Sequence, residues 1–354
     1  MRKFKAAIIS FAHIHAYSYA RVLKGLDNVE FVAIWDDRRE RGELAKNRYA
    51  INKYYDDLDK LFKENKDLDF VIVTSENAKH YEHVKIALEN DIHVLCEKPL
   101  TVDLKQADEL VGLARRKGLK LGTCFVMRFH TSTIQAYNIL REERIGIPMS
   151  ITTTNHGTCP YKEAHWFVEP ELSYGARIRL REGDSRFRGG CITDHTVHCA
   201  DLLRWLLGSE VSEIYAEVGG NIRSELEVED NALVILKFRN GVQASIDCSW
   251  SRPEGVYPTW GDVNLYIVGT NGALDIEAFN QNIWLATWDT QRLVFNYWGT
   301  DVDWNMIVQF IEAIERDEEP RANGWDGRQA TEIMLAAYES VSRRKPIRLP
   351  LTHT

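Results

Sequence analysis

The chain has 354 residues, of which 44% are hydrophobic and 27% charged, and its net charge is -8. These values are typical of a soluble globular protein and exclude a disordered chain, a collagen and a coiled coil. No basic stripe marks a nucleic-acid-binding protein, and no apolar run approaches the ~20 residues that span a bilayer. At about 150 residues per domain, the length predicts roughly two domains. The six cysteines form no CxxC pair, which indicates reduced thiols in a cytosolic protein.

The first 124 residues alternate short apolar runs with amphipathic stretches. Strands are expected at Ala6–Ser10, Val29–Trp35, Asp69–Val73, Ile92–Cys96 and Leu119–Phe125. Helices are expected at Ala16–Leu26, Leu58–Phe62, His80–Glu89 and Asp103–Arg116. This alternation predicts a parallel sheet covered by helices on both faces. Ligands of such sheets bind beyond the carboxyl ends of the strands.

After residue 125 the pattern changes to consecutive strands joined by short turns. Helices are expected at Ser132–Glu143, Thr196–Leu207, Trp304–Arg316 and Gly327–Arg343. Strands are expected at Ile214–Val218, Ala232–Phe238, Val242–Trp250, Val263–Val268 and Leu293–Tyr297. Asn-Gly pairs at 240–241 and 271–272 are hairpin turn signals. The predicted fold class is therefore α/β, with a Rossmann-type parallel sheet in residues 1–124. An α+β domain with a mostly antiparallel sheet follows in residues 125–354, and its C-terminal helices could pack on the first domain.

The turn after the first predicted strand is a candidate dinucleotide site without its usual glycines. The six positions of G-x-G-x-x-G are occupied by Ser10-Phe11-Ala12-His13-Ile14-His15, so the glycine fingerprint is absent. The context remains, because a strand precedes the turn, a helix follows it, and Asp36 ends the next strand. An acid at that position commonly binds an adenosine ribose hydroxyl. The alternative is that Asp36 only begins a turn and caps a helix.

Cys96-Glu97-Lys98-Pro99 stands at the carboxyl end of the fourth predicted strand. A lysine in such a crevice can lose solvation and donate to a substrate oxygen. The alternative is a surface salt bridge between Glu97 and Lys98.

A third motif runs from Gly189 to Asp201 and opens a helix. Asp194 and His198 are four residues apart and therefore share one helix face, where a carboxylate can orient an imidazole as a general base. Asp194 could instead cap the helix while His198 packs in the core. A metal set of Cys191, Asp194, His195 and His198 is a weaker alternative.

A second metal-site hypothesis concerns the turn after the first predicted strand. His13-x-His15 could be the ligand pair of a metal-dependent hydrolase barrel. The chain lacks the eight strand–helix repeats of that fold.

Taken together, these motifs resemble the glucose–fructose oxidoreductase / inositol dehydrogenase / MocA (Gfo/Idh/MocA) family over nearly the whole chain. The resemblance rests on Asn77-Ala78-Lys79-His80, on Ile92 to Leu100 with its Glu97-Lys98-Pro99, and on Gly189-Gly190 with Asp194 and His198. It extends to Glu229-Asp230-Asn231 and to Trp325-Asp326-Gly327-Arg328. It implies a nicotinamide-binding Rossmann domain and a substrate domain that oxidises sugar- or cyclitol-like alcohols.

The resemblance also implies roles for individual residues. Catalysis is expected from Lys98, Asp194 and His198, with His198 as the base and Lys98 as the alternative base. Substrate binding is expected from Lys98, Arg128, Asp194, His195 and His198. Cofactor binding is expected from Ser10, Phe11, Ala12, His13, Ile14, His15, Asp36, Thr74, Asn77, His80, Glu97 and Lys98. Asp36 favours NAD, and NADP is the alternative because Arg38 or Arg39 could receive its extra phosphate. No metal is expected.

Two other functions compete with an NAD(P)-dependent oxidoreductase acting on a sugar, polyol, cyclitol or sugar acid. One is a redox-inactive family member that serves as a binding or regulatory protein, and the other is a metal-dependent hydrolase or lyase. The arginine-rich segment 177–188 is either a lid for an acidic group or a solvated loop. The expected partners are a carbohydrate-like substrate and further copies of the chain, in a cytoplasmic homodimer or homotetramer assembled through the sheet of residues 211–298. Neither nucleic acid nor membrane is an expected partner.

Overall fold

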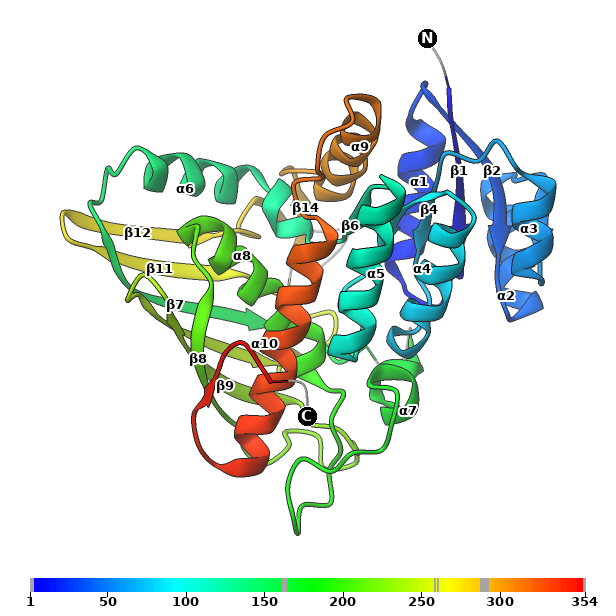
Figure 1. Cartoon of the computed structure of the whole chain (residues 1–354). Helices are drawn as coiled ribbons and strands as arrows, with labels where there is room; N and C mark the ends of the chain where they lie inside the picture. The colour runs from blue at the N-terminus through cyan, green and yellow to red at the C-terminus, as the bar shows by residue number, and fades with distance from the viewer. Residues whose placement is uncertain (1–2, 161–163, 258, 260, 287–292, 353–354) are drawn as a thin grey trace. The chain divides into compact units, whose positions relative to one another are not determined.

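The computed structural model describes residues 3–160, 164–257, 259, 261–286 and 293–352. It consists of two compact units (Figure 1). Unit 1 comprises Met1–Val126, Glu163–Ala176 and Asp303–Thr331. Unit 2 comprises Met127–Lys162, Arg177–Val302 and Glu332–Thr354. Two segments that lie well beyond residue 125 therefore belong to the same unit as the N-terminal strands.

Unit 1 is built on a six-stranded sheet in the order β3-β2-β1-β4-β5-β6, and its neighbouring strands all pair in parallel. The strands are β1 (Phe4–Ile9), β2 (Val29–Trp35), β3 (Lys53–Tyr55), β4 (Phe70–Val73), β5 (His93–Cys96) and β6 (Leu121–Thr123). This is the doubly wound order in which ligands bind where the strand order reverses, beside the carboxyl ends of β1 and β4. The predicted parallel sheet is confirmed. The short strand β3 was not predicted, because its Lys-Tyr-Tyr sequence lacks the apolar run of a doubly buried strand.

Helices cover both faces of this sheet, which explains why its strands are almost continuously apolar. They are α1 (His15–Gly25), α2 (Arg39–Tyr49), α3 (Leu58–Glu64), α4 (His80–Glu89), α5 (Leu104–Lys117) and α9 (Val302–Glu315), with the short turn η1 (Asn77–Lys79). On one face, side chains of α4 and α5 such as Val84 and Leu110 join the buried cluster of Val71 and Val94. On the other face, the rings of Phe70 and Phe310 meet at 5.8 Å, so α9 contributes to the cover of that face.

A segment from the middle of the chain completes unit 1. It contains η3 (His165–Val168) and α7 (Pro170–Ser173). The Asn77 side chain donates to the carbonyl of Ser173 at 3.0 Å, and the Trp166 indole donates to the carbonyl of Ala12 at 3.0 Å. The segment thus packs beside the carboxyl ends of the strands.

Unit 2 contains a seven-stranded sheet in the order β12-β11-β7-β10-β9-β8-β15. The strands are β7 (Pro148–His156), β8 (Val211–Glu217), β9 (Asn231–Phe238), β10 (Gln243–Ser249), β11 (Asn264–Gly269), β12 (Gly272–Glu277) and β15 (Ile347–Arg348). Only the pair β10 and β7 is parallel, so the predicted, mostly antiparallel sheet is confirmed. The prediction missed β7, because its threonine-rich, half-polar alternation resembles a loop. Strands β13 (Asn282–Ala286) and β14 (Leu293–Tyr297) pair antiparallel in a separate two-stranded sheet.

Helices lie on one face of the unit 2 sheet (Figure 1). They are α6 (Thr131–Arg141), the π-helical turn η4 (Ile192–Thr196) that leads into α8 (Val197–Leu207), and the second half of α10 (Gly324–Arg343); the short turn η2 (Val126–Phe129) precedes α6. Side chains of β9 alternate between the buried face and the open face of the sheet: Val234 and Leu236 are fully buried, whereas Leu233 and Ile235 are 47% and 44% exposed. The sheet therefore presents apolar side chains on the face that helices leave open.

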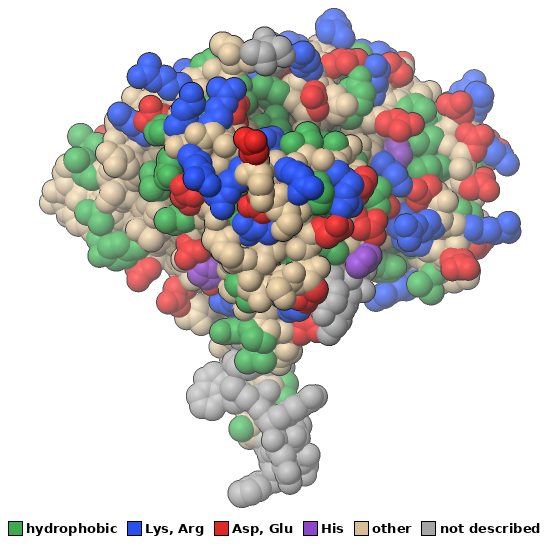
Figure 2. Space-filling model, turned by 90° about the horizontal axis from the view of Figure 1, so that it is seen from below, with side chains coloured by type: hydrophobic (Ala, Val, Ile, Leu, Met, Phe, Trp, Pro, Cys, Tyr) green, Lys and Arg blue, Asp and Glu red, His purple; other side chains and the backbone are tan. Residues whose placement is uncertain are grey.

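Among the described residues, no helix is long and apolar enough to cross a membrane. On the face drawn in Figure 2, Lys and Arg side chains are interspersed with Asp and Glu. This mixture agrees with the absence of a basic stripe in the sequence.

Candidate active site

The turn between β1 and α1 keeps the backbone shape of a glycine-rich turn without its glycines. Ser10 occupies the first glycine position with φ 74°, a left-handed conformation that costs an L-residue about 1–2 kcal/mol. Its hydroxyl oxygen accepts hydrogen bonds from the Ala12 amide and from Arg41 Nη2, both at 3.1 Å. These bonds offset part of the conformational cost.

The backbone amides of this turn already have acceptors within unit 1. The donors, acceptors and distances are Phe11 N to Asp36 Oδ2 at 2.7 Å, Ala12 N to Ser10 Oγ at 3.1 Å, His13 N to the Thr74 carbonyl at 3.0 Å, His15 N to His13 Nδ1 at 3.1 Å, and Ala16 N to the His13 carbonyl at 3.1 Å. In a glycine-rich turn such amides are the groups that bind a pyrophosphate. Here the Ser10 and His13 side chains accept hydrogen bonds from two of these amides, which are therefore already engaged without a pyrophosphate.

Asp36 lies at the end of β2, fully buried. Arg41 Nε donates to its two carboxylate oxygens at 2.8 and 3.0 Å, and the Arg38 amide donates at 2.8 Å. Burial raises the pKa of Asp36 above its usual value, although the bonds from Arg41 oppose this shift. The sequence analysis predicted the acid but missed Arg41, which lies in the first turn of α2. Arg38 and Arg39, named as phosphate-binding alternatives, are exposed.

A cavity of about 310 Å³ adjoins this turn. Its lining includes Phe11 and Ile14 from the turn, Arg38 and Arg41 from the region after β2, and Trp166 from the covering segment. An apolar wall with guanidinium groups beside the carboxyl ends of parallel strands fits the adenosine and phosphate parts of a dinucleotide. The residues present therefore fit that cofactor, which Phe11, Ala12, Ile14 and Asp36 would hold.

The covering segment brings aromatic rings to the same place. Trp166 and Phe167 stack with their centroids 3.9 Å apart. Phe167 meets the ring of His13 edge-on at 5.2 Å, and Lys98 Nζ lies 5.7 Å from the Phe167 centroid. Sequence reasoning missed these aromatic residues because they are more than 60 residues from the nearest motif of unit 1.

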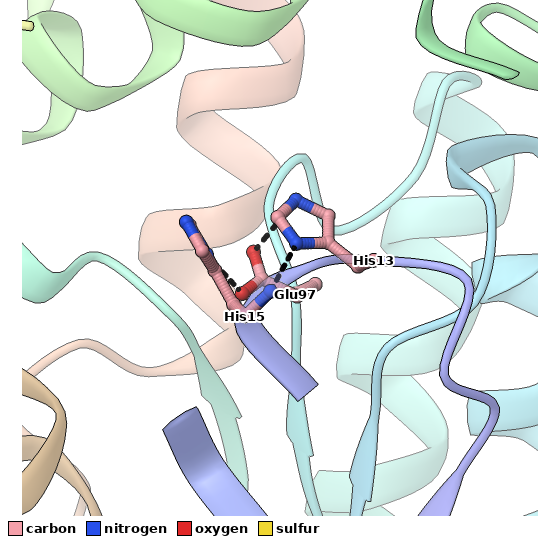
Figure 3. A group of neighbouring side chains, drawn as sticks. All are labelled: His13, His15 and Glu97. Atoms are coloured by element: carbon pink, nitrogen blue, oxygen red, sulfur yellow. Dashed lines mark hydrogen bonds and ion pairs between the residues drawn. The ribbon is translucent and has the colours of Figure 1, made fainter. Parts of the chain in front are cut away.

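Glu97 is the centre of a buried cluster with His13 and His15 (Figure 3). His15 Nδ1 lies 2.9 Å from Glu97 Oε1, and His13 Nε2 lies 3.9 Å from Glu97 Oε2. The Tyr19 hydroxyl also donates to Glu97 Oε1, and the Lys98 amide donates to Oε2 at 3.0 Å. Glu97 and Lys98 are both buried, so the alternative of a surface salt bridge between them is wrong.

The protonation of this cluster follows from its charges. Burial alone would raise the pKa of Glu97, but the neighbouring imidazoles of His13 and His15 hold it well below its usual value. Burial lowers the pKa of His15, but the charge of Glu97 and the hydrogen bond to it outweigh burial and raise that pKa above its usual value. Each group of the Glu97–His15 pair thus favours the charged form of the other.

The same three residues are the one group of described residues compact enough to be considered as metal ligands, with candidate ligand atoms within 4.8 Å of one another. The hydrogen bond from the His15 amide to His13 Nδ1 opposes this use. A neutral imidazole that accepts at Nδ1 carries its proton at Nε2, which is the atom that faces Glu97. Because a metal ligand needs a lone pair there, the residues present do not fit a metal well, and a metal-free protein stays a prediction.

The other cofactor residues predicted in unit 1 bind the backbone around the site. The Thr74 hydroxyl donates to the Ser10 carbonyl at 2.6 Å. The His80 ring nitrogens lie 2.7 Å from the Pro99 carbonyl oxygen and 3.1 Å from that of Ser75. Thr74 and His80, with Asn77, thus brace the ends of β1, β4 and β5, and their direct contact with a cofactor stays a prediction.

In unit 2, the π-helical turn η4 carries Asp194 and His195 into α8. Asp194 is not the N-cap residue of either helical element, because Cys191 precedes η4 and Thr196 precedes α8. Its Oδ2 accepts from Trp250 Nε1 at 3.0 Å and lies 3.2 Å from His195 Nε2. His195 Nδ1 lies 2.8 Å from the Asn155 carbonyl oxygen. The capping alternative is therefore wrong for Asp194. Irregular π turns of this kind are frequent at functional sites.

The two remaining predicted residues of unit 2 are both buried. His198 lies in α8, one turn after Asp194. Arg128 forms a bidentate ion pair with Asp201, with Nε and Nη2 donating at 2.7 and 2.6 Å. Substrate binding by Arg128 stays a prediction. Cys191 Sγ lies 4.0 Å from Cys248 Sγ, and the set Cys191, Asp194, His195 and His198 is not among the compact groups of the described residues.

A buried carboxylate to which the sequence analysis assigned no role, Glu229, holds the start of this helix. Glu229 Oε1 accepts from the Ile192 amide at 3.1 Å and from the Tyr338 hydroxyl at 2.7 Å. The Tyr338 oxygen in turn accepts from the Gly189 amide at 2.9 Å. A Cβ on Gly190 would lie 1.7 Å from the Glu229 carbonyl oxygen, so only glycine fits there. Burial raises the pKa of Glu229 to about 7.

The arginine-rich segment 177–188 forms ion pairs within unit 2. Arg186 Nε donates to Asp184 at 3.0 Å, Arg181 lies 3.4 Å from the same carboxylate, and Arg177 pairs with Glu227. A role as a lid stays a prediction.

Comparison with known proteins agrees with this architecture. Residues 4–125 match the family model described as "Oxidoreductase family, NAD-binding Rossmann fold", and residues 133–275 match the "GFO/IDH/MocA C-terminal domain". Relatives include myo-inositol 2-dehydrogenase of Thermotoga maritima, 26% identical over 343 residues and 94% of both chains. D-apiose dehydrogenase of Paraburkholderia graminis is 24% identical over 369 residues, covering 99% of this chain and 90% of that protein.

Solved structures show the same fold. A probable dehydrogenase from Thermotoga maritima superposes with a TM-score of 0.80 at 24% identity, covering 98% of this chain and 99% of its own. GenD2 from gentamicin A biosynthesis, solved in complex with NAD, has a TM-score of 0.85 at 19% identity, covering 99% and 97%. With both domain models matched in order along the chain, the protein belongs to the Gfo/Idh/MocA family of oxidoreductases with an NAD-binding Rossmann fold.

Proposed function

We propose that the chain transfers a hydride between NAD and a secondary alcohol of a sugar, polyol, cyclitol or sugar acid. The observation that carries the proposal is the buried Lys98 at the carboxyl end of β5, in the unit that also holds the dinucleotide turn and Asp36. Family membership and relatives named as inositol and apiose dehydrogenases support the choice of substrate class.

The reaction needs a hydride acceptor, which the nicotinamide supplies when bound, and a base for the hydroxyl proton. His198 takes that proton, because its ordinary pKa of about 6.5 is close to neutral pH. Asp194, held by Trp250 Nε1 at 3.0 Å, orients substrate hydroxyls. Lys98 Nζ donates to the reacting oxygen and stabilises its alkoxide character. The alternative assignment makes Lys98 the base and leaves His198 to bind substrate.

A screen of sugars and cyclitols for NADH formation identifies the substrate and tests the proposal. With that substrate, His198→Asn should lower kcat by about 10²–10⁴ while NADH binding is retained, and Lys98→Met should also lower turnover strongly. His165→Asn is the control for a histidine outside the proposed catalytic set, since 69% of its side chain is exposed; because His165 lines the proposed cofactor cavity, kcat is compared at saturating NAD. A near-normal kcat for His198→Asn would show that His198 is not the base.

A second candidate function is a redox-inactive binding protein, and the glycine-free turn with its internally bonded amides favours it. It predicts that NADH binds weakly or not at all and that no compound in the screen is oxidised. Turnover that depends on Lys98 would exclude this function.

We further propose a homodimer or homotetramer in the cytoplasm. The exposed apolar residues Leu233, Ile235 and Tyr266 on the open sheet face of unit 2 support a subunit contact. The six cysteines are all buried and form no CxxC pair, which supports a reducing compartment.

A further inference from the structure

The dinucleotide turn has few backbone donors to offer to an anion. The amides of Phe11, Ala12, His13, His15 and Ala16 each donate to an acceptor inside unit 1. Helix α1 also has no side-chain cap at its start. A bound diphosphate would need another donor in place of the amides that a glycine-rich turn offers.

His15 has the geometry of that donor. It stands at the third glycine position of the turn, and its Nδ1 lies 2.9 Å from Glu97 Oε1. This contact fixes the ring, and Figure 3 shows its far nitrogen pointing away from the carboxylate. Among the described residues, no hydrogen bond or ion pair uses His15 Nε2, and 31% of the side chain is exposed. A carboxylate that holds one ring nitrogen and leaves the other available is a common way to orient a functional imidazole.

The groups around His15 come from several elements. Glu97 follows β5, Tyr19 lies one turn further along α1, and the ring of His13 lies 4.3 Å away between centroids. Asp303 of α9 favours the charged ring and Lys98 opposes it. Glu97 and Asp303 both raise the pKa of His15, and the net shift is upward, so the surroundings favour the charged form of this ring.

We propose that His15, oriented by Glu97, binds the cofactor diphosphate through Nε2–H and thereby makes dinucleotide affinity depend on protonation of its ring. The inference rests on the proposed function only in taking a dinucleotide as the ligand. The direction of the pH dependence follows from the charges. The charged ring binds the diphosphate, so dinucleotide affinity is high at low pH and falls as the ring loses its proton. A charge-assisted hydrogen bond of this kind is worth about a factor of ten or more in affinity.

The test is equilibrium binding, with no substrate present. The dissociation constants of NADH, ADP-ribose and adenosine are measured from about pH 6 to about pH 8.5, a range that brackets the ordinary imidazole pKa of about 6.5. For the wild-type chain, NADH and ADP-ribose should bind about tenfold more weakly at the high end, whereas adenosine, which lacks phosphate, should show no change. His15→Gln and His15→Gly should both give dissociation constants that do not vary with pH, because each removes the imidazole. The second variant also restores the glycine that is usual at this position of the turn.

His165→Asn is the matched control, since it removes a histidine that lines the cavity beside the turn but pairs with Glu169 rather than with Glu97, and it should keep the wild-type pH dependence. The proposal is wrong if His15→Gln keeps that dependence, or if His165→Asn loses it. It is also wrong if EDTA abolishes NADH binding, which would identify a metal site. Binding that is tight but independent of pH overturns this inference and leaves the proposed function intact. Absence of NADH binding at every pH overturns both.

Discussion

Glu229 should make unit 2 less stable as the pH rises. Its carboxylate is fully buried, and its Oε2 has no hydrogen-bond partner among the described residues. Burial raises its pKa from 4.5 to about 7. A carboxyl group with a raised pKa in the folded state stabilises the fold below its unfolded pKa, and this stability is lost as the pH rises through the folded value.

The size of the effect follows from these two values. Integrating proton uptake for a pKa of 4.5 in the unfolded chain and about 7 in the fold gives a loss of about 2.5 kcal/mol between about pH 5 and pH 8.5. Glu229→Gln keeps an oxygen that accepts from Tyr338 and Ile192 but cannot ionise. The amide itself can change the free energy of unfolding, but it does so equally at both pH values, so this contribution cancels when they are compared. The free energy of unfolding of the variant minus that of the wild type should therefore rise by about 2.5 kcal/mol over this range.

The assay is urea unfolding followed by tryptophan fluorescence at both pH values, with hydrogen exchange of peptides from α8 and β9 to report on unit 2 alone. Glu227→Gln is the matched control: it changes an exposed carboxylate two residues away, which pairs with Arg177. Its stability difference should stay within about 0.5 kcal/mol at both pH values. A Glu229→Gln difference that is the same at both pH values would refute the assignment of a neutral buried Glu229.

Three further expectations concern the cofactor, metals and assembly. NAD should bind more tightly than NADP, because Asp36 repels a 2′-phosphate and already engages Arg41; equal or tighter binding of NADP in a comparison of dissociation constants contradicts this. Metal analysis of the purified chain should find no stoichiometric ion. The prediction of a metal-free protein is wrong if about one zinc per chain survives dialysis and is needed for activity. Light scattering should detect a dimer or tetramer at micromolar concentration, and Leu233→Lys should weaken it; a wild-type monomer removes the proposed contact.

Much of unit 1 could be predicted from the sequence because its strands are buried on both faces. Such strands read as short apolar runs, and the helices between them have one apolar face, as Ala107, Leu110 and Ala114 show in α5. Parallel strands share one edge for their carboxyl ends, so the residues after β1, β2 and β5 were expected at one place. Asp36 and Lys98 were predicted to be site residues on this basis.

The sequence was less informative where one face of a strand is polar or where backbone shape carries the signal. Strand β7 has a half-exposed threonine pattern that resembles a loop. Ser10 adopts a positive φ that its residue type disfavours, and hydrogen bonds from Ala12, Arg41 and Thr74 to Ser10 help to stabilise it. Neither feature has a local motif that could reveal it.

The contacts that position the candidate residues within each unit were decided by the tertiary structure. His15 and Glu97 are 82 residues apart, Trp166 reaches Ala12 across 154 residues, and Tyr338 reaches Glu229 across 109. The local sequence determines which segments become helices and strands, since propensity and apolar periodicity act over a few residues. It does not determine which buried polar groups will share a hydrogen bond, because that choice depends on how distant elements pack and on the cost of leaving any such group without a partner.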